Sequence, residues 1–310
     1  MRALVALGGN AMTRPDGLAR PQDQIAAIGT AMQHVADLVV HGHEVALTHG
    51  NGPQVGNLLV KNELAAAVVP PVPLDWCVAQ TQATIGFVVL SALEAALAER
   101  QVRRPVAALV TRSLVDGSDP GFTHPTKPIG RYLPAAEAGV LVGHGETWQD
   151  RGPRGWRRVV ASPEPLEILD AEPVVALMSA GFVVVAAGGG GIPCVRDADG
   201  RLHGVEAVID KDLAAALLAR TVRAEVLVIA TDVEHVVTGW GTPDAAELDE
   251  APVGVLRRLA AHGAFAAGSM APKVEAACRF VEAGGTHAVI CSLDAIAEAA
   301  HGRAGTVVHP

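Results

Sequence analysis

The feature that most constrains this fold is a glycine-rich turn that directly follows an apolar stretch and occurs three times in the chain. Residues 45–56 read VALTHGNGPQVG, which indicates a β-strand, the turn Gly50-Asn51-Gly52 and a helix that begins at Pro53. Proline suits the first helical position, and glycine lets the backbone approach a ligand closely. The free N–H groups at the helix start favour an anion, although many such turns bind nothing. This turn alone therefore leaves ligand binding open.

The other two turns follow the same plan. The apolar residues 3–7 lead into Gly8-Gly9-Asn10, and residues 182–187 lead into four consecutive glycines, 188–191. In open α/β sheets, ligands bind in the crevice beyond the carboxyl ends of the strands. We therefore expect the three turns to converge on one crevice.

Apolar stretches alternate along the chain with segments of helical periodicity, which predicts a parallel sheet with helices on both faces. Strands are expected at 3–7, 45–48, 106–111, 182–187, 226–230, 288–291 and 305–308, with a hairpin near Asp199-Gly200. Helices are expected at 21–41, 74–101, 171–180, 213–219 and 294–301, and also from Pro53 and around Lys273. Residues 236–249 are expected to form a loop.

Composition disfavours several classes of partner. The formal net charge of −9 makes nucleic acids and anionic membranes poor partners, so any anion site must be local. Half of the 310 residues are apolar and 18% are charged, which suits a large core. The uncharged run 173–194 is long enough to span a membrane, but glycines and Pro193 break it, so a helix end and a buried strand are expected instead.

Cysteine and histidine spacing gives no reason to expect a metal site. The cysteines at 77, 194, 278 and 291 have no C-x-x-C spacing, which is typical of small buried side chains in a reducing cytosol. His41 and His43 stand two apart and would need further ligands. The N-terminus shows no basic flank with an apolar segment, so no signal peptide is indicated and a cytoplasmic protein is expected.

Residues 113–162 differ in composition from the rest of the chain. Apolar periodicity fades there, and Pro, Gly, Thr and Arg dominate. Fifty residues are too many for an ordinary connection, so an inserted subdomain or lid is expected. Its basic residues form either a solvated surface or a cationic flap over an anionic site, and both interpretations stay open. These residues are Lys127, Arg131, Arg151, Arg154, Arg157 and Arg158.

Two further lysines stand at expected helix starts. The stretch 206–213, EAVIDKDL, places Lys211 between two carboxylates. Asp212 could be the N-cap of the following helix, or the lysine could be a phosphate ligand that its acidic neighbours hold in place. Lys273 falls in the first turn of another helix, where the helix dipole disfavours a cation. A bound anion would make that position easier to understand.

The motifs that are missing narrow the chemistry. The chain has no G-x-x-x-x-G-K-[ST] loop and no G-x-S-x-G elbow, and its four glycines are not a G-x-G-x-x-G fingerprint. A glycine-lined crevice with candidate lysines at 127, 211 and 273 instead suits phosphoryl transfer, in which a protein positions two anions and neutralises charge. No nucleophile and base pair stands out. A substrate whose attacking oxygen is already ionised needs none.

Seven motifs together resemble the carbamate kinase family of the amino acid kinase superfamily. They are ALGGNA (6–11), THGNGPQVGN (48–57), PTKPIG (125–130), RGWRRVV (154–160), GGGGIP (188–193), GVEAVIDKD (204–212) and GSMAPK (268–273). A single motif such as GGGG is weak, but PTKPIG, VIDKD and GSMAPK together are specific. The match runs in order over almost the whole chain.

The resemblance implies a single domain, 1–310, that is a three-layer αβα sandwich with a mainly parallel open sheet and an inserted, protruding subdomain. Residues 1–181 would form the phosphoryl-acceptor lobe, which carries the flap 113–162, and residues 182–310 the nucleotide-binding lobe. It also implies a cytoplasmic homodimer that uses Mg²⁺ held mainly by the nucleotide phosphates. The expected reaction is ATP plus carbamate, from ammonia and bicarbonate, in equilibrium with ADP plus carbamoyl phosphate, often running toward ATP at the end of arginine catabolism.

The resemblance also implies roles for individual residues. Carbamate and the transferred phosphoryl would be held by Gly8, Gly9, Asn10, Gly50, Asn51 and Gly52. Lys211 and Lys273 would balance phosphate charge, oriented by Asp212. Lys127 would supply the cation that related kinases carry on the first strand, which here reads ALVAL. The nucleotide would be bound by Gly189, Gly190, Asp232, Trp240 and Met270.

The base pocket is the part in which this chain departs from the family pattern. Trp240 stands where many members have tyrosine, and ATDVEHV replaces the more usual TGVD. Two other functions are also considered. A kinase for a longer acid such as acetylglutamate would need side chains to grip it, which the glycine and asparagine lining disfavours. A non-catalytic nucleotide sensor would not need all three lysines.

Overall fold

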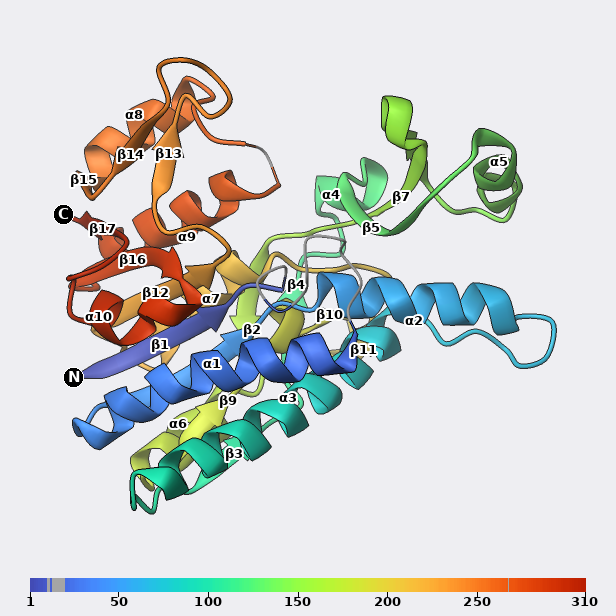
Figure 1. Ribbon diagram of the computed structural model, residues 1–310. Coiled ribbons are helices and arrows are strands. Elements are labelled where there is room, and N and C mark those ends of the chain that lie inside the picture. Colours follow the sequence, from blue (N-terminus) through green and yellow to red (C-terminus); the bar gives the residue numbers. More distant parts are fainter. Residues whose placement is uncertain (10–11, 13–19, 267) are drawn as a thin grey trace.

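A computed structural model describes residues 1–9, 12, 20–266 and 268–310. Its centre is an eight-stranded sheet in the order β15-β17-β16-β12-β1-β2-β9-β3 (Figure 1). All neighbouring strands are parallel except β16 and β17. The strands are β1 (Arg2–Leu7), β2 (Glu44–His49), β3 (Val106–Ala108), β9 (Val183–Val185), β12 (Val226–Thr231), β15 (Glu250–Pro252), β16 (His287–Ser292) and β17 (Thr306–His309).

Helices cover both faces of this sheet. One face carries α1 (Pro21–Val40), α3 (Leu74–Glu99) and α10 (Ile296–Ala300), after the 3₁₀ turn η4 (Leu293–Ala295). The other carries α6 (Ala171–Ser179), α7 (Lys211–Thr221), α8 (Val253–Ala261) and α9 (Met270–Glu282).

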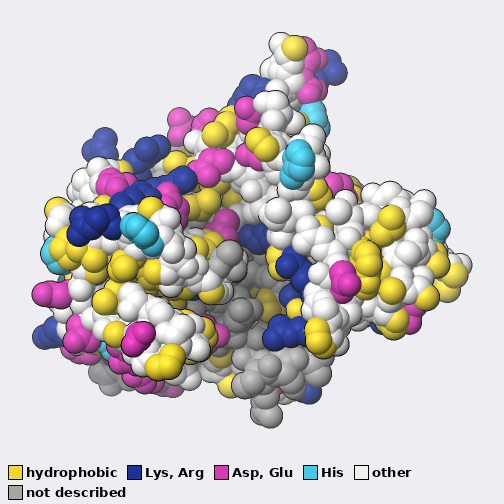
Figure 2. All heavy atoms as spheres, turned by 90° about the horizontal axis from the view of Figure 1, so that it is seen from above, with side chains coloured by type: hydrophobic (Ala, Val, Ile, Leu, Met, Phe, Trp, Pro, Cys, Tyr) yellow, Lys and Arg dark blue, Asp and Glu magenta, His cyan; other side chains and the backbone are white. Residues whose placement is uncertain are grey.

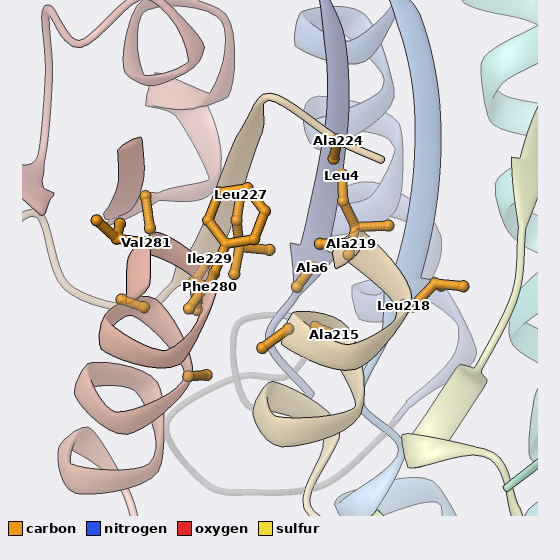
Figure 3. Packing of buried hydrophobic residues seen from close by; sticks show 14 of the residues in the cluster. Leu4, Ala6, Ala215, Leu218, Ala219, Ala224, Leu227, Ile229, Phe280 and Val281 are labelled. Atoms are coloured by element: carbon orange, nitrogen blue, oxygen red, sulfur yellow. The ribbon is translucent and has the colours of Figure 1, made fainter. Parts of the chain in front are cut away.

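Alternation along each strand produces these layers, because successive strand residues point to opposite faces. In β1, Val5 points into the first core and Leu4 and Ala6 into the second. Figure 3 shows Leu4 and Ala6 of β1 facing α7 in that second core, with Leu4 beside Ala219. The predicted three-layer αβα sandwich with a mainly parallel sheet is confirmed.

A second, four-stranded sheet lies beside the main one, in the order β11-β10-β4-β8. Its strands are β4 (Arg112–Val115), β8 (Pro165–Ile168), β10 (Ile192–Arg196) and β11 (Leu202–Gly204). β10 and β11 pair antiparallel, which confirms the hairpin expected near residues 199 and 200. The third glycine turn, η3 (Gly188–Gly190), connects the two sheets, because it follows β9 and precedes β10.

A small subdomain protrudes from the sandwich (Figure 1). Its antiparallel sheet consists of β5 (Lys127–Leu133), β7 (Trp156–Val160) and β6 (Trp148–Asp150), accompanied by α4 (Pro120–Thr123), α5 (Ala135–Gly143) and η2 (Gly152–Arg154). Leu133, Ala138 and Trp148 form its own buried cluster. Residues 113–115 belong to β4, although we expected the insertion to begin there. The division into an acceptor lobe and a nucleotide lobe stays a prediction.

Two local predictions were wrong. The strand expected over residues 106–111 ends at Ala108. Thr111 is not part of this strand, and its Oγ1 accepts a hydrogen bond from the backbone N–H of Ala187 (2.7 Å). The loop expected over residues 236–249 contains the antiparallel pair β13 (Val236–Thr238) and β14 (Ala246–Leu248). Three-residue strands are too short to show apolar alternation.

One further helix follows the second glycine turn, and another has one exposed apolar side. α2 (Gly52–Ala65) follows the second glycine turn as predicted. α3 is long and apolar enough to cross a membrane by length and composition, and it is the one such helix in the described part of the chain. One side of α3 is buried against α1 and the sheet, with Val89 and Leu93 in the core. Its other side exposes Trp76 and Phe87.

Candidate active site

A cavity of about 390 Å³ opens at the carboxyl ends of β1, β2 and β12. Figure 2 shows a hollow in this face of the molecule, with Lys and Arg side chains along one wall. Asn10 lies outside the described residues, and Gly190 does not line the cavity. All the other predicted site residues do: Gly8, Gly9, Gly50, Asn51, Gly52, Lys127, Gly189, Lys211, Asp212, Asp232, Trp240, Met270 and Lys273.

The first two glycine turns lie against each other at the cavity floor. The N–H of Gly8 donates to the carbonyl of Ala230, and that of Gly50 donates to the carbonyl of Leu7, both at 2.8 Å. A Cβ on Gly50 would lie 2.7 Å from the backbone nitrogen of Gly9, closer than real Cβ atoms come. Glycine is therefore required at position 50 by close backbone approach, and the same approach places two strand ends around one small space.

Asp212 connects two of the predicted lysines. Its carboxylate is 4% exposed and forms ion pairs through Oδ1 with Lys211 Nζ and through Oδ2 with Lys273 Nζ, the latter at 3.1 Å. Lys211 begins α7 and Lys273 lies in the first turn of α9, so the carboxylate joins two helix starts. Burial of these charges requires pairing, because an isolated buried charge is costly.

The third lysine comes from the protruding subdomain and lies beside the same helix start. Nζ of Lys127 donates to the carbonyl oxygen of Ile209 at 3.0 Å and lies 3.5 Å from Oδ2 of Asp210. The amino groups of all three predicted lysines therefore surround the first turn of α7 and line one cavity.

The N-cap of α7 is Asp210 and not Asp212. Oδ1 of Asp210 accepts hydrogen bonds from the N–H groups of Asp212 (2.9 Å) and Leu213 (3.4 Å). The interpretation of Asp212 as the cap was therefore wrong. Because Asp210 satisfies the backbone donors of the first turn, the carboxylate of Asp212 is left to pair with the lysines.

Burial acts in opposite directions on the pKa values of Asp212 and Lys211. Burial by itself would raise the pKa of Asp212, but the charges of Lys211 and Lys273 hold that pKa below its ordinary value. Burial lowers the pKa of Lys211, and Lys273 adds to this effect while Asp212 opposes it. The carboxylate is therefore ionised, and an arriving anion would favour the charged form of Lys211.

The charge of Lys273, which the helix dipole disfavours at this position, is paired with a carboxylate of the same chain. The carboxylate of Asp212 supplies the negative charge that a bound anion was invoked to supply. The lysine also donates to the carbonyl of Ser269 at 3.4 Å, so its amino group is directed back over the helix start.

Three of the remaining basic residues of the insertion have partners within the protein. Arg131 pairs with Glu63 at 3.2 Å, and Arg158 pairs with Glu146 at 3.1 Å. Arg157 stacks over the ring of Tyr132. Of the six basic residues named from the sequence, Lys127 is the one that lines the cavity in the described part of the chain. The insertion therefore contributes one lysine to the lining of the cavity, and the interpretation of its arginines as a cationic flap stays a hypothesis.

The other end of the cavity is apolar and open. It is lined by Val233, His235, Val237, Trp240 and Met270. Trp240 is 70% exposed, and Asp232 is exposed beside Thr231, whose hydroxyl donates to its carboxylate at 3.0 Å. Such a surface offers a flat ring and aliphatic side chains, which suit the contact with an aromatic base.

Two site residues were missed from the sequence. Asp210 was noticed only as one of two acids that flank Lys211, although an Asp before an apolar helix is a recognisable cap. His49 is 1% exposed, and its Nδ1 donates to the carbonyl of Gly50 at 3.0 Å. Burial lowers the pKa of His49 to about 4, so the ring is neutral near pH 7. Its position in THGNGP, next to the turn, was the available sign.

The whole chain is similar to known proteins. A family profile described as the amino acid kinase family matches residues 1–292. The carbamate kinase of Thermococcus kodakarensis is 43% identical over 99% of this chain and 98% of its own length, and the carbamate kinase-like protein YqeA of Escherichia coli is 44% identical with the same coverage. The solved carbamate kinase of Giardia lamblia bound to AMP-PNP has a TM-score of 0.92 at 38% identity, covering 99% of this chain and 98% of that one.

Proposed function

We propose, on the premise that the chain belongs to the amino acid kinase family, that it is a carbamate kinase. The reaction is reversible phosphoryl transfer between ATP and carbamate, which makes the protein a phosphotransferase with a carboxyl group as acceptor. The observation that carries this proposal is the meeting of three lysine amino groups, from three separate elements, at the first turn of α7 inside a glycine-walled cavity.

The proposed step needs no general base. One carbamate oxygen, already ionised, forms the new bond to the γ-phosphorus while the bond from that phosphorus to the β,γ-bridging oxygen breaks, and ADP leaves with the electron pair. The main obstacle is repulsion between two anions, together with charge that develops on the bridging oxygen. Fixed positive charges and N–H donors that are in place before the reaction lower this barrier.

The residues would divide this work by position. The turns at Gly8-Gly9 and Gly50-Asn51-Gly52 would hold carbamate and the γ-phosphoryl through the backbone N–H groups of Gly9, Asn51 and Gly52, since those of Gly8 and Gly50 donate to strand carbonyls. Lys211 and Lys273 would move from their shared partner Asp212 onto phosphate oxygens, and Asp212 would keep both amino groups directed into the cavity. Lys127 would leave Asp210 and the carbonyl of Ile209 to contact the transferred phosphoryl.

The nucleotide would extend toward the apolar end of the cavity. Gly189, Asp232, Trp240 and Met270 line the cavity, and Gly190 follows Gly189 in the same turn. Mg²⁺ would enter as the MgATP complex and be held mainly by phosphate oxygens, as is usual for this ion. The proposal therefore assigns no protein ligand to the metal.

We further propose that the chain works as a homodimer through the exposed side of α3. Trp76 is 61% and Phe87 67% exposed, which is unusual for large apolar side chains on one helix. Light scattering should give twice the 31.9 kDa mass of one chain, and Phe87→Glu should reduce it to one. Ile25→Glu, at an apolar position on α1 that is 54% exposed, serves as the control. A monomeric wild-type protein would contradict this assembly.

We also propose that the protein acts in the cytoplasm and that its reaction runs toward ATP synthesis. This reaction would serve the breakdown of arginine through carbamoyl phosphate, as the family resemblance implies. Formation of ATP from ADP and carbamoyl phosphate should outpace the reverse reaction at equal substrate concentrations.

A coupled assay with carbamate, acetylglutamate or no acceptor tests the substrate. The proposal predicts turnover when carbamate is the acceptor, and none with acetylglutamate or without an acceptor. Turnover with acetylglutamate would indicate a sister kinase, and nucleotide binding without turnover a sensor.

A further inference from the structure

A set of buried polar side chains lies beneath the acceptor end of the cavity. The described part of the chain contains ten buried polar or charged residues, and seven of them lie here, each at most 4% exposed: Thr48, His49, Asn51, Thr81, Gln82, Thr111 and Ser113. They come from β2, the turn that follows it, α3 and the segment around β4. Burying polar groups is unfavourable unless they are hydrogen-bonded, so their concentration at one place needs an explanation.

Gln82 of α3 joins the most distant parts of this set. Its Nε2 donates to the carbonyls of Thr111 (3.0 Å) and Gly188 (2.9 Å). Its Oε1 accepts from the backbone N–H of Thr111 at 2.8 Å. Both amide hydrogens and one oxygen lone pair are therefore used to hold backbone groups, and the carbonyl of Gly188 is fixed at the start of the third glycine turn.

The residue before that turn is held in an unusual conformation. Ala187 has a φ of 51°, in the left-handed region that residues with a Cβ rarely adopt. Its N–H donates to Thr111 Oγ1 (2.7 Å), and its carbonyl accepts from Thr48 Oγ1 (2.9 Å). Strained backbone of this kind persists only where its surroundings hold it, and it gathers at functional sites.

The third glycine turn also positions residues of the second glycine turn. A Cβ on Gly189 would lie 2.1 Å from Asn51 Nδ2, and one on Gly188 would lie 2.4 Å from His49 Nε2. The two turns are thus in direct contact, with no space for a side chain on either glycine. Asn51 is also held from the other side, since its Nδ2 donates to Thr81 Oγ1 at 2.8 Å.

We propose that Gln82 is a positioning residue for the acceptor end of the site. It contacts no reactant; it fixes Gly188, and through the Gly188-Gly189 backbone it fixes Asn51 and the N–H groups of the second turn. This inference rests on the proposed function, because that function places the acceptor at Asn51. Because Gly189 of the same turn is also assigned to the nucleotide, loss of Gln82 should disturb the carbamate side of the cavity more than it weakens nucleotide binding.

The test replaces Gln82 by methionine, which keeps the length and removes the hydrogen bonds. Gln22→Met, at an exposed position of α1, is the control. We expect kcat/KM for carbamate to fall by about tenfold to 10²-fold, as for a misplacement of around 1 Å, and the Kd of AMP-PNP to rise by less than about threefold. A folded variant with unchanged carbamate kinetics, or an equal loss of AMP-PNP affinity, would overturn the proposal.

A second variant keeps the test decisive if Gln82→Met does not fold. Thr111→Val preserves shape and removes the acceptor for Ala187, so it should loosen the same turn, whereas Thr111→Ser should retain wild-type kinetics. Hydrogen exchange of the peptides that contain residues 50–52 and 188–191 gives a readout that needs no turnover. Faster exchange in both turns is expected. If the wild type lacks carbamate turnover, the proposed function fails, while unchanged exchange would refute the positioning role separately.

Discussion

The two ends of the cavity are built in different ways. At the glycine end, backbone turns contact each other, and buried or half-buried charges are paired through Asp212 and Asp210 before any ligand arrives. At the apolar end, Trp240 is 70% exposed and extends from the short β13–β14 pair. Groups that are fixed in advance stabilise a transition state without reorganisation, whereas an exposed ring adds only ground-state contact. Changes at the first end should therefore alter turnover, and changes at the second should alter affinity.

The largest expected effect is at the buried lysine of α7. Lys211→Ala should lower kcat by about 10²-fold or more, because one preorganised charge on the phosphoryl is lost. Steady-state ADP formation with carbamate measures it, and Arg220→Ala, an exposed position on the same helix, is the control. A loss of less than about threefold would contradict the role assigned to Lys211 and the proposed difference between the two ends of the cavity.

The next effect concerns the buried histidine under the second turn. The pKa of His49 is lowered from 6.5 to about 4 in the folded protein, so between these pH values the unfolded chain binds a proton that the folded protein does not. The free energy of unfolding should therefore decrease as pH falls from about 7 to 4, by up to about 3 kcal/mol from this group.

His49→Gln should remove that part of the pH dependence, and urea unfolding at pH 7, 5.5 and 4 would measure it. His262→Gln, at an exposed position, should leave the slope as it is in the wild type. If both variants keep the wild-type slope, the buried neutral ring contributes nothing to the stability of the glycine end.

A smaller effect is expected from the lysine of the protruding subdomain. Lys127→Ala should reduce kcat by about tenfold while the Kd of ADP changes little, because Lys127 would contact the transferred phosphoryl, which ADP lacks. Arg131→Ala, in the same subdomain but paired with Glu63, should have no such effect. Equal losses in turnover and nucleotide affinity would place Lys127 on the nucleotide side.

The smallest effect is expected at the apolar end. Trp240→Ala should weaken AMP-PNP binding about threefold to tenfold, as for the loss of one exposed aromatic stack, and leave kcat at saturating ATP unchanged. Isothermal titration and steady-state kinetics on the same preparation measure both. A drop in kcat with normal affinity would reverse the proposed division between the two ends.

The sequence predicted the glycine end better than the apolar end, for physical reasons. Glycine turns after apolar runs are local patterns, and lysines at helix starts are visible because they oppose the helix dipole. The roles of Asp210 and Gln82 depend on partners far along the chain, such as Lys127 and Gly188, which no local pattern reveals. The short β13 and β14 were missed because their pairing, and not their composition, defines them.

The central claim is that three lysines surround one phosphoryl group. A crystal structure with ADP and a planar or tetrahedral phosphoryl mimic, in the presence of carbamate, tests it most directly. The account predicts the amino nitrogens of Lys127, Lys211 and Lys273 about 3 Å from phosphoryl or β-phosphate oxygens, with Asp212 between the latter two. Phosphates bound elsewhere, with all three lysines still paired to Asp210 and Asp212, would contradict it.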